Sequence, residues 1–312
     1  MKKKLVAGAV TLLSVVTLAA CANGTNKDVV TMKGDTITVS DFYDEIKTNQ
    51  GAQQVLFQMT INKVFEKEYG SKVSDKEVDK ELAKQKKQLG NQFDAYLAQQ
   101  GLTEETAKKQ IRSNMLLEYA VNQAAKKDIK ESDYKAAFES YTPEVTAQII
   151  KLDSEDKAKE VLEAAKAEGA DFAQIAKDNS TDTATKDKGG EVKFDSGTSG
   201  IPSQVKEAAF KLDENGISDV ITVSAGQNYS ASYYIVKLNK KTEKGSDWKK
   251  YEKRLKEIIV DGRKQDTNYI RSIIAKAMTN ANIKVKDDAF KSTFNQYLQN
   301  IGVQTSDSKS SS

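Results

Sequence analysis

Few residue types in this 312-residue sequence could carry out chemistry. It contains one cysteine, Cys21, and no histidine. A single thiol excludes an intramolecular disulfide, and without histidine no His/Cys metal site can be built. A Ser-His-Asp triad and every mechanism that uses imidazole as acid or base are excluded as well. The chemistry left to the chain is that of carboxylates, hydroxyls, amides and apolar pockets, together with one thiol, and we expect neither a metal nor a cofactor.

Cys21 stands at the end of a segment with the layout of a secretory signal. Lys2 to Lys4 are basic, Leu5 to Ala20 is an apolar run without acid, and small residues precede the cysteine. The run is shorter than the roughly 20 apolar residues of a transmembrane helix. Leu18-Ala19-Ala20-Cys21 resembles the lipobox of bacterial lipoproteins, which implies removal of residues 1–20 and lipid on the thiol. We therefore expect a lipid anchor on the extracytoplasmic face of the bacterial cell membrane.

Charge is nearly balanced once the predicted signal is removed. The full sequence has 48 Lys and Arg against 45 Asp and Glu, and residues 1–20 hold three of the lysines and no acid. A nucleic-acid partner would require a clustered basic excess, which the remaining sequence lacks. Charged residues make up 30% of the chain and apolar residues 38%, so we expect two or three modest domains rather than one large core.

Residues 21–28 predict a polar, lipidated tether, and a β-hairpin follows it. Val29 to Met32 and Thr36 to Val39 have the pattern of strands on either side of Gly34-Asp35, which is a turn signal. We expect Ser40 to cap the next helix, because the acidic residues of its first turns favour a helix N-terminus.

Helical patterns dominate the rest of the N-terminal segment, up to residue 142. Ser74 and Glu77 form a capping box, which marks the start of a helix. An apolar stripe at helical spacing predicts that this helix runs on to Gly101, and Thr103 starts another. The stripe consists of Val78, Leu82, Leu89, Phe93 and Leu97. Such stripes indicate helix–helix core rather than a ligand site.

The composition changes after Pro143. Segments 145–152 and 232–238 have the pattern of strands, helical patterns lie between them, and a stretch rich in Gly, Asp, Thr and Ser covers 179–200. Residues 143–241 therefore predict a small α+β domain of about one hundred residues, which is the common domain size.

Helical patterns return from Trp248 and continue to a weak last helix. Ile283 to Val285 has the pattern of a short closing strand, and residues 301–312 predict a disordered tail. Because helices flank the α+β segment on both sides, we expect 29–142 and 242–300 to pack together as one discontinuous helical domain. The expected fold class is α+β, with the smaller α+β domain inserted into the helical one.

A series of short landmarks runs through the α+β segment. In chain order they are Val145 to Ile150, Gly169 to Phe172, Ile175-Ala176, Ser180 to Asp182, Gly189-Gly190, Ile201-Pro202, Glu207 to Phe210, Gly216 to Ser218 and Tyr234 to Lys237. Together they resemble a parvulin-type peptidyl-prolyl isomerase domain. With the lipobox and the helical arms, the whole chain is similar to the PrsA-type foldase lipoproteins of Gram-positive bacteria, and the arms resemble trigger-factor-like chaperones. The resemblance implies a membrane-anchored protein that helps secreted polypeptides fold after they cross the membrane.

Isomerisation of an X–Pro bond requires no nucleophile or metal. Amide resonance sets the barrier, roughly 18–20 kcal/mol, and a catalyst stabilises the twisted amide with an apolar pocket and a few polar groups. In parvulins, those polar groups are two histidines and a Cys or Asp. At the corresponding positions this chain has Gln148 and Tyr234 for the histidines and Asp182 for the acid. The three could still hydrogen-bond to one another, although Asp182 suits a loop cap equally well.

The proline pocket that the resemblance implies is also altered. Ile201 stands at the position of the pocket Met, and Val205 stands at that of the pocket Phe, which removes aromatic area. Phe210 is retained and would suit a core equally well. We therefore expect a parvulin-like domain whose isomerase activity is weak or lost.

Several classes of function stay open at this point. An ATP-free foldase would hold unfolded secreted proteins by weak, multivalent contacts, and the sequence has no Gly-x-x-x-x-Gly-Lys-Ser/Thr motif. An active prolyl isomerase is the alternative. A solute-binding lipoprotein of a transporter would require two α/β lobes, and an adhesin or coiled-coil spacer would require sustained heptads. The expected partners are unfolded secreted proteins and the membrane, without nucleic acid, and pairing of two copies through the arms stays open.

Overall fold

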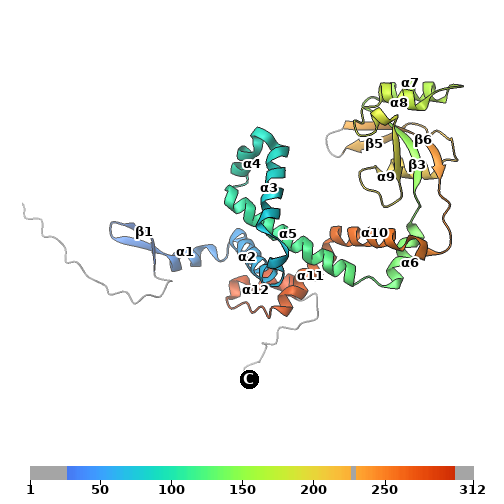
Figure 1. The fold of residues 1–312 in the computed structure, drawn as a ribbon. Coiled ribbons are helices and arrows are strands. Elements are labelled where there is room, and N and C mark those ends of the chain that lie inside the picture. The colour runs from blue at the N-terminus through green and yellow to red at the C-terminus, as the bar shows by residue number, and fades with distance from the viewer. Residues whose placement is uncertain (1–26, 226–229, 299–312) are drawn as a thin grey trace, which may run out of the picture. The chain divides into compact units, whose positions relative to one another are not determined.

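The computed structural model describes residues 27–225 and 230–298 (Figure 1). The predicted signal peptide 1–20, the predicted lipidation site Cys21 and the predicted tail 301–312 lie outside the described residues. Within the described ranges, none of the helices combines the length and the apolar character needed to cross a membrane.

The chain divides into two compact units. Of the described residues, 27–71 and 274–298 belong to one unit, and 72–225 with 230–273 belong to the other. The domain boundaries expected from the sequence, at residues 142 and 242, divide the chain differently and stay a prediction. In the structure, the helices between residues 72 and 142 pack with a helix that follows residue 242 and share a unit with the α+β segment.

The terminal unit starts with the predicted hairpin, which is confirmed. β1 (Asp28–Met32) and β2 (Asp35–Thr38) pair in antiparallel fashion. Two helices follow, α1 (Val39–Ile46) and α2 (Gln50–Tyr69). A two-stranded hairpin is only marginally stable by itself. The two helices lead from it into the packed part of the unit.

The N-cap of α1 differs from the prediction. Ser40 was expected to cap this helix, but the cap is Thr38, two residues earlier. Asp41 lies three residues after Thr38 and completes a capping box with it. The Asp41 amide donates to Thr38 Oγ1 at 3.2 Å, and the Thr38 amide donates to Asp41 Oδ2 at 2.9 Å.

Aromatic side chains join α2 to α12 (Lys291–Leu298) within the terminal unit. The ring of Phe57 stacks on that of Tyr297 with centroids 4.4 Å apart, and it meets Phe294 edge-on at 5.4 Å. The predicted closing strand from Ile283 to Val285 is wrong, because that segment is irregular. A single apolar–polar–apolar triplet provides too few ladder hydrogen bonds to define a strand.

The second unit opens with α3 (Asp75–Leu89), α4 (Phe93–Gln99), α5 (Glu104–Lys127) and α6 (Glu131–Ser140). The capping box predicted at Ser74 is confirmed, and Thr103 caps α5 as expected. The single helix predicted up to Gly101 is wrong. The chain breaks at Gly90, whose φ of +51° lies in the left-handed region that glycine adopts readily.

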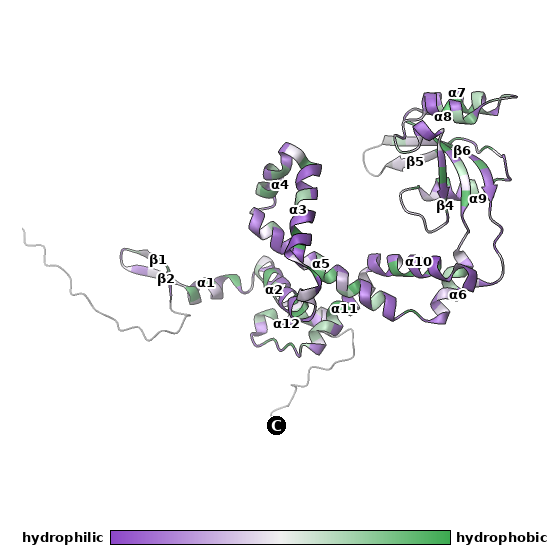
Figure 2. Ribbon diagram, in the orientation of Figure 1, coloured by the Kyte–Doolittle hydropathy of each residue, from purple (hydrophilic) through white to green (hydrophobic). Residues whose placement is uncertain are grey.

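Two further helices follow the sheet in the chain, α10 (Glu252–Gln265) and α11 (Thr267–Asn280). α10 packs along α5 and α6. Arg263 of α10 donates to the carbonyl oxygen of Ala125 at 2.9 Å and pairs with Asp133 at 2.8 Å. These helices carry both hydrophilic and hydrophobic residues (Figure 2), as expected of helices that bury one face.

Between α6 and α10 lies a four-stranded antiparallel sheet with the order β4-β3-β6-β5. Its elements are β3 (Val145–Leu152), α7 (Glu155–Lys166), α8 (Phe172–Asn179), β4 (Glu191–Phe194), α9 (Ser203–Lys211), β5 (Ile221–Ala225) and β6 (Ser230–Lys241). The predicted α+β fold class is confirmed. The central strands β3 and β6 were predicted, whereas the short outer strands β4 and β5 were missed.

Each face of this sheet has its own apolar core. On one face, α9 covers a cluster made of Val145, Ala147, Ile149, Phe194, Val205, Ala209, Val236 and Leu238. On the other face, α7 and α8 cover Ile150, Leu152, Ala158, Val161, Ala165, Phe172, Ala176 and Ile235. Because successive side chains of a strand alternate between faces, the position of a residue in β3 or β6 decides which core it faces.

Candidate functional site

Gln148 and Tyr234 lie on the two central strands and on opposite faces of the sheet. Gln148 of β3 pairs with Lys237 of β6, and Tyr234 of β6 pairs with Lys151 of β3. Cross-strand partners share a face, and three positions along a ladder correspond to roughly 10 Å and a change of face. Tyr234 packs on the α9 core. Gln148 is on the other face, and its side-chain amide, through Nε2, donates to the carbonyl oxygen of Gly189 at 2.9 Å.

Asp182 caps its own loop after α8. Its Oδ2 accepts a hydrogen bond from the Thr185 hydroxyl at 2.5 Å, and its Oδ1 accepts one from the Ala184 amide at 3.2 Å. This is the arrangement of an Asx turn. Within the described residues, no hydrogen bond joins Asp182, Gln148 and Tyr234, so the polar cluster that the sequence left open is not formed.

The loop from Asp182 returns to the sheet through Gly189-Gly190. Both glycines have positive φ, +67° and +79°. A Cβ atom on Gly190 would lie 2.6 Å from the carbonyl oxygen of Ile149, and one on Gly189 would lie 2.7 Å from Cβ of Ala173. Glycine is therefore required for β4 to approach β3, and the same turn places the Gly189 carbonyl beside Gln148.

The predicted pocket residues gather on the α9 face together with Tyr234. Val205 is fully buried in the core, whereas Ile201, Phe210 and Tyr234 are half-buried and pack around it. The ring of Phe210 lies 5.7 Å from that of Phe194, centroid to centroid. Ile201, Phe210 and Tyr234 are thus part of the accessible apolar surface, which also includes Val192, Leu212, Ile221 and Val223, while Val205 lies in the core beneath it.

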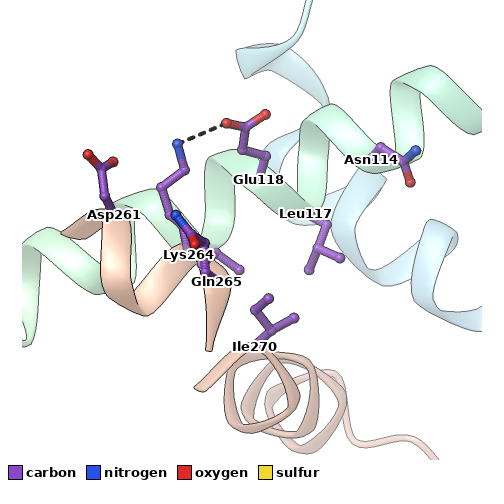
Figure 3. Close-up of a pocket in the computed structure, with 8 residues that line it drawn as sticks. Asn114, Leu117, Glu118, Asp261, Lys264, Gln265 and Ile270 are labelled. Atoms are coloured by element: carbon purple, nitrogen blue, oxygen red, sulfur yellow. Dashed lines mark ion pairs between the residues drawn. The ribbon is translucent and has the colours of Figure 1, made fainter. Parts of the chain in front are cut away.

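A separate groove of about 470 Å³ lies among α5, α10 and α11 (Figure 3). Leu117 and Ile270 point toward one another across it. Val121, which is buried, is another of its lining residues. At its rim, Lys264 pairs with Glu118 at 3.1 Å. An apolar floor with a charged rim can accept apolar side chains of a polypeptide. The apolar stripes of the sequence predicted helix packing here and gave no signal for a groove.

Among residues 27–225 and 230–298, no three acidic side chains are grouped so as to hold a metal ion.

The fold and the matched sequence define the class of the protein. The model of the PPIC-type peptidyl-prolyl isomerase domain, named Rotamase, matches residues 122–240. These residues contain the four-stranded sheet with α7, α8 and α9, so the chain carries a parvulin-type domain on helical arms.

Similarity over nearly the whole chain identifies the particular family. The foldase protein PrsA of Streptococcus sanguinis (strain SK36) is 62% identical over 302 residues, 97% of this chain and 90% of that protein. The crystal structure of PrsA from Streptococcus pneumoniae has a TM-score of 0.79 and 55% identity, covering 87% of this chain and 99% of that one. The PrsA structure from Lactococcus lactis has a TM-score of 0.66 and 39% identity, covering 87% and 99%. The chain belongs to the PrsA foldase family, which replaces the solute-binding and adhesin alternatives.

Proposed function

We propose that this chain is a lipid-anchored foldase that acts on unfolded secreted proteins at the extracytoplasmic face of the cell membrane. Its helical arms hold clients, and the isomerase activity of its parvulin domain is weak or lost. Family membership supports the foldase part of the proposal. The lipobox that ends at Cys21 supports the anchor, and no nucleotide or other cofactor enters the mechanism.

One observation carries the proposal of weak isomerase activity. Gln148 and Tyr234 occupy the positions that the family resemblance assigns to histidines, yet they face opposite sides of the sheet. The Gln148 amide is engaged by the carbonyl oxygen of Gly189. Of these two residues, only Tyr234 packs beside the apolar surface, and one neutral hydrogen bond from its hydroxyl to a twisted amide would contribute only about 0.5–1.5 kcal/mol.

An active isomerase is the second candidate. The half-buried side chains of Ile201 and Phe210 beside Tyr234 favour it, because they form an apolar surface suited to a proline ring next to a hydroxyl donor. Asp182 would then take part only after release from its Asx turn.

Prolyl isomerisation of a short peptide by the full chain after Cys21 distinguishes the two candidates. We expect little acceleration, and none that depends on Asp182. Asp182→Ala is compared with Asp178→Ala, a change at an exposed position on α8. Strong acceleration that only Asp182→Ala removes would establish the active isomerase instead.

The groove among α5, α10 and α11 supports the holding of clients. Suppression of the aggregation of a reduced, unfolded protein measures this function directly. Leu117→Asp and Ile270→Asp place charge in the groove, and we expect them to weaken suppression by roughly two- to tenfold. Tyr96→Asp on α4 is the matched control, because Tyr96 is exposed in the same unit. Equal suppression by all variants would place the client surface elsewhere.

Pairing of two copies through the arms is the last part of the proposal. β1 and α1 expose large apolar side chains, among them Val29, Met32 and Phe42, each 52% exposed. Exposed apolar patches of this kind are typical of protein interfaces. Sedimentation of the wild type and of Met32→Asp and Phe42→Asp variants tests this pairing, and a wild-type monomer at all concentrations would contradict it.

A further inference from the structure

The loop that leads to the proline-pocket surface is bonded to a helix outside the parvulin fold. Asp195 follows the last residue of β4, and residues 195–200 connect it to Ile201 of the pocket surface. The Asp195 carboxylate, in a residue only 6% exposed, is held by a bidentate pair. Arg254 Nε donates to Oδ2 at 2.6 Å, and Arg254 Nη2 donates to Oδ1 at 2.9 Å. Arg254 lies on α10, after the end of the family match.

Three more donors complete the shell of Asp195. Tyr141 lies before β3, outside the strands of the sheet, and its hydroxyl donates to Asp195 Oδ2 at 3.1 Å. The Thr198 hydroxyl and the Gly197 amide donate to Oδ1 at 2.9 and 3.0 Å. A buried carboxylate with this many partners is fully satisfied, and loss of any one partner is expensive.

The ionisation states in this cluster are stable near neutral pH. Burial opposes the charge of Asp195, but the hydrogen bonds from Arg254 and Thr198 outweigh it and hold its pKa below the ordinary 3.8. Burial, together with the neighbouring carboxylate, raises the pKa of Tyr141. The carboxylate thus stays charged and the phenol stays a donor.

The same loop is clamped from both of its sides. On one side, Lys206 of α9 donates to the carbonyl oxygens of Ser196 and Thr198, each at 2.9 Å. On the other, Gly197 lies so close to α10 that an added Cβ would fall 2.4 Å from Cγ1 of Ile258. A side chain at this position would require the Ile258 side chain or the loop to move.

We infer that Arg254 and Tyr141 are positioning residues for the proline-pocket surface, which is complete only when the 195–200 loop is docked on α10. This inference rests on the pocket surface named in the proposed function. Both residues bind Asp195 and act through the loop that leads to Ile201. A segment cut at 143–241 lacks both residues and therefore has a looser pocket than the full chain.

The test uses the full chain after Cys21 and a short peptide with one Ala-Pro bond. Arg254→Gln removes the bidentate pair, Arg254→Lys keeps the charge, and Arg271→Gln on α11 is the matched control at an exposed position. Amide exchange of residues 195–201 and the methyl NMR signal of Ile201 report on the loop. Peptide titration followed by the same methyl signal gives the affinity.

For Arg254→Gln, we expect exchange of the loop to rise about tenfold and peptide binding to weaken about fivefold. Arg254→Lys is expected to lie between this variant and the wild type, because one point charge cannot replace a bidentate fork. If the wild type catalyses isomerisation of the peptide, we expect the variants to lose catalytic efficiency through a higher KM, with kcat unchanged.

The outcomes separate this inference from the proposed function. Two results for Arg254→Gln would overturn the positioning role. In the first, the loop opens but peptide affinity stays unchanged; in the second, the loop does not open. If the wild type binds no peptide at the Ile201 surface, the pocket itself is wrong and the inference fails with it. The aggregation assay of the groove variants is untouched by either result.

Discussion

Alanine at position 197 is expected to push the 195–200 loop off α10. The new Cβ would lie 2.4 Å from Cγ1 and 2.5 Å from Cδ1 of Ile258, whereas carbon atoms in contact are about 3.5–4.0 Å apart. Overpacking of this kind costs about 1–3 kcal/mol. Gly197 does not have a positive φ, so alanine adds no backbone strain and recovers about 0.4–1 kcal/mol from the unfolded state.

Taking the middle of both ranges, the net loss for Gly197→Ala is about 1–2 kcal/mol for docking of the loop. Since 1.4 kcal/mol is tenfold in an equilibrium constant, amide exchange of the loop is expected to accelerate about five- to thirtyfold. Native-state exchange measures this local opening directly, without requiring the two compact units to unfold together.

A compensating change in the partner makes this prediction specific. Ile258→Ala removes the atoms that an alanine at position 197 would strike, so the double variant is expected to dock better than the sum of the single effects, by about 1 kcal/mol or more. Gly262→Ala on α10 is the control, because no atom lies within 4 Å of its added Cβ. Unchanged exchange in Gly197→Ala, or strict additivity in the double variant, would refute the steric reasoning.

Three other predictions test the close approach of β4 to β3, the docking of the 195–200 loop on α10 and the lipid anchor. Gly190→Ala, with φ +79° and its Cβ 2.6 Å from the Ile149 carbonyl oxygen, is expected to lower the stability of the parvulin domain by about 3 kcal/mol or more in urea unfolding; wild-type stability would contradict the close approach of β4. The pKa of Asp195 is lowered in the folded state. The stability that its carboxylate contributes to loop docking is therefore fully present above pH 3.8 and is lost as the pH falls through the lower folded value. Amide exchange of the loop, corrected for intrinsic rates, is expected to be equal at pH 7 and pH 5 and to rise only under stronger acid. Cys21→Ala is expected to release the protein from the membrane fraction, and retention of the variant there would require another anchor.

Local signals predicted the elements that local chemistry decides. The hairpin around Gly34-Asp35 and the capping box at Ser74 were found because turn and cap residues act within a few positions. Ser40 was wrong for the same kind of reason, since Thr38 has an acid three residues later and forms two reciprocal hydrogen bonds. The break at Gly90 was missed because a single glycine inside an apolar stripe is compatible both with a continuous helix and with a stop.

The outer strands of the sheet were not visible in the sequence. β4 holds four residues within a stretch rich in turn residues, and it exists because Gly189-Gly190 bring it against β3. β5 is five residues long and is fixed by pairing with β6. Short strands of this kind take their stability from cross-strand partners distant in sequence, which a local pattern does not contain.

The role of Asp195 could not be predicted from the sequence either. The sequence placed it inside a polar loop, where an acid is unremarkable. Only the fold shows that it is buried and that its charge is met by Arg254, 59 positions later. A pairing over such a distance is a tertiary property, so no spacing rule could have predicted it.

The geometry of the sheet separates the residues at the two histidine positions. Gln148 and Tyr234 are three ladder positions apart on opposite faces, so a side chain of either must reach around a strand edge to act on the same amide as the other. Gln148 does not do so, because its amide is bonded to Gly189 next to α8. The apolar surface on the α9 face therefore lies beside Tyr234 and not beside Gln148. Under the proposed function, we expect this face to bind a proline-containing segment better than it twists the peptide bond, since binding alone does not lower a barrier unless contacts strengthen in the transition state.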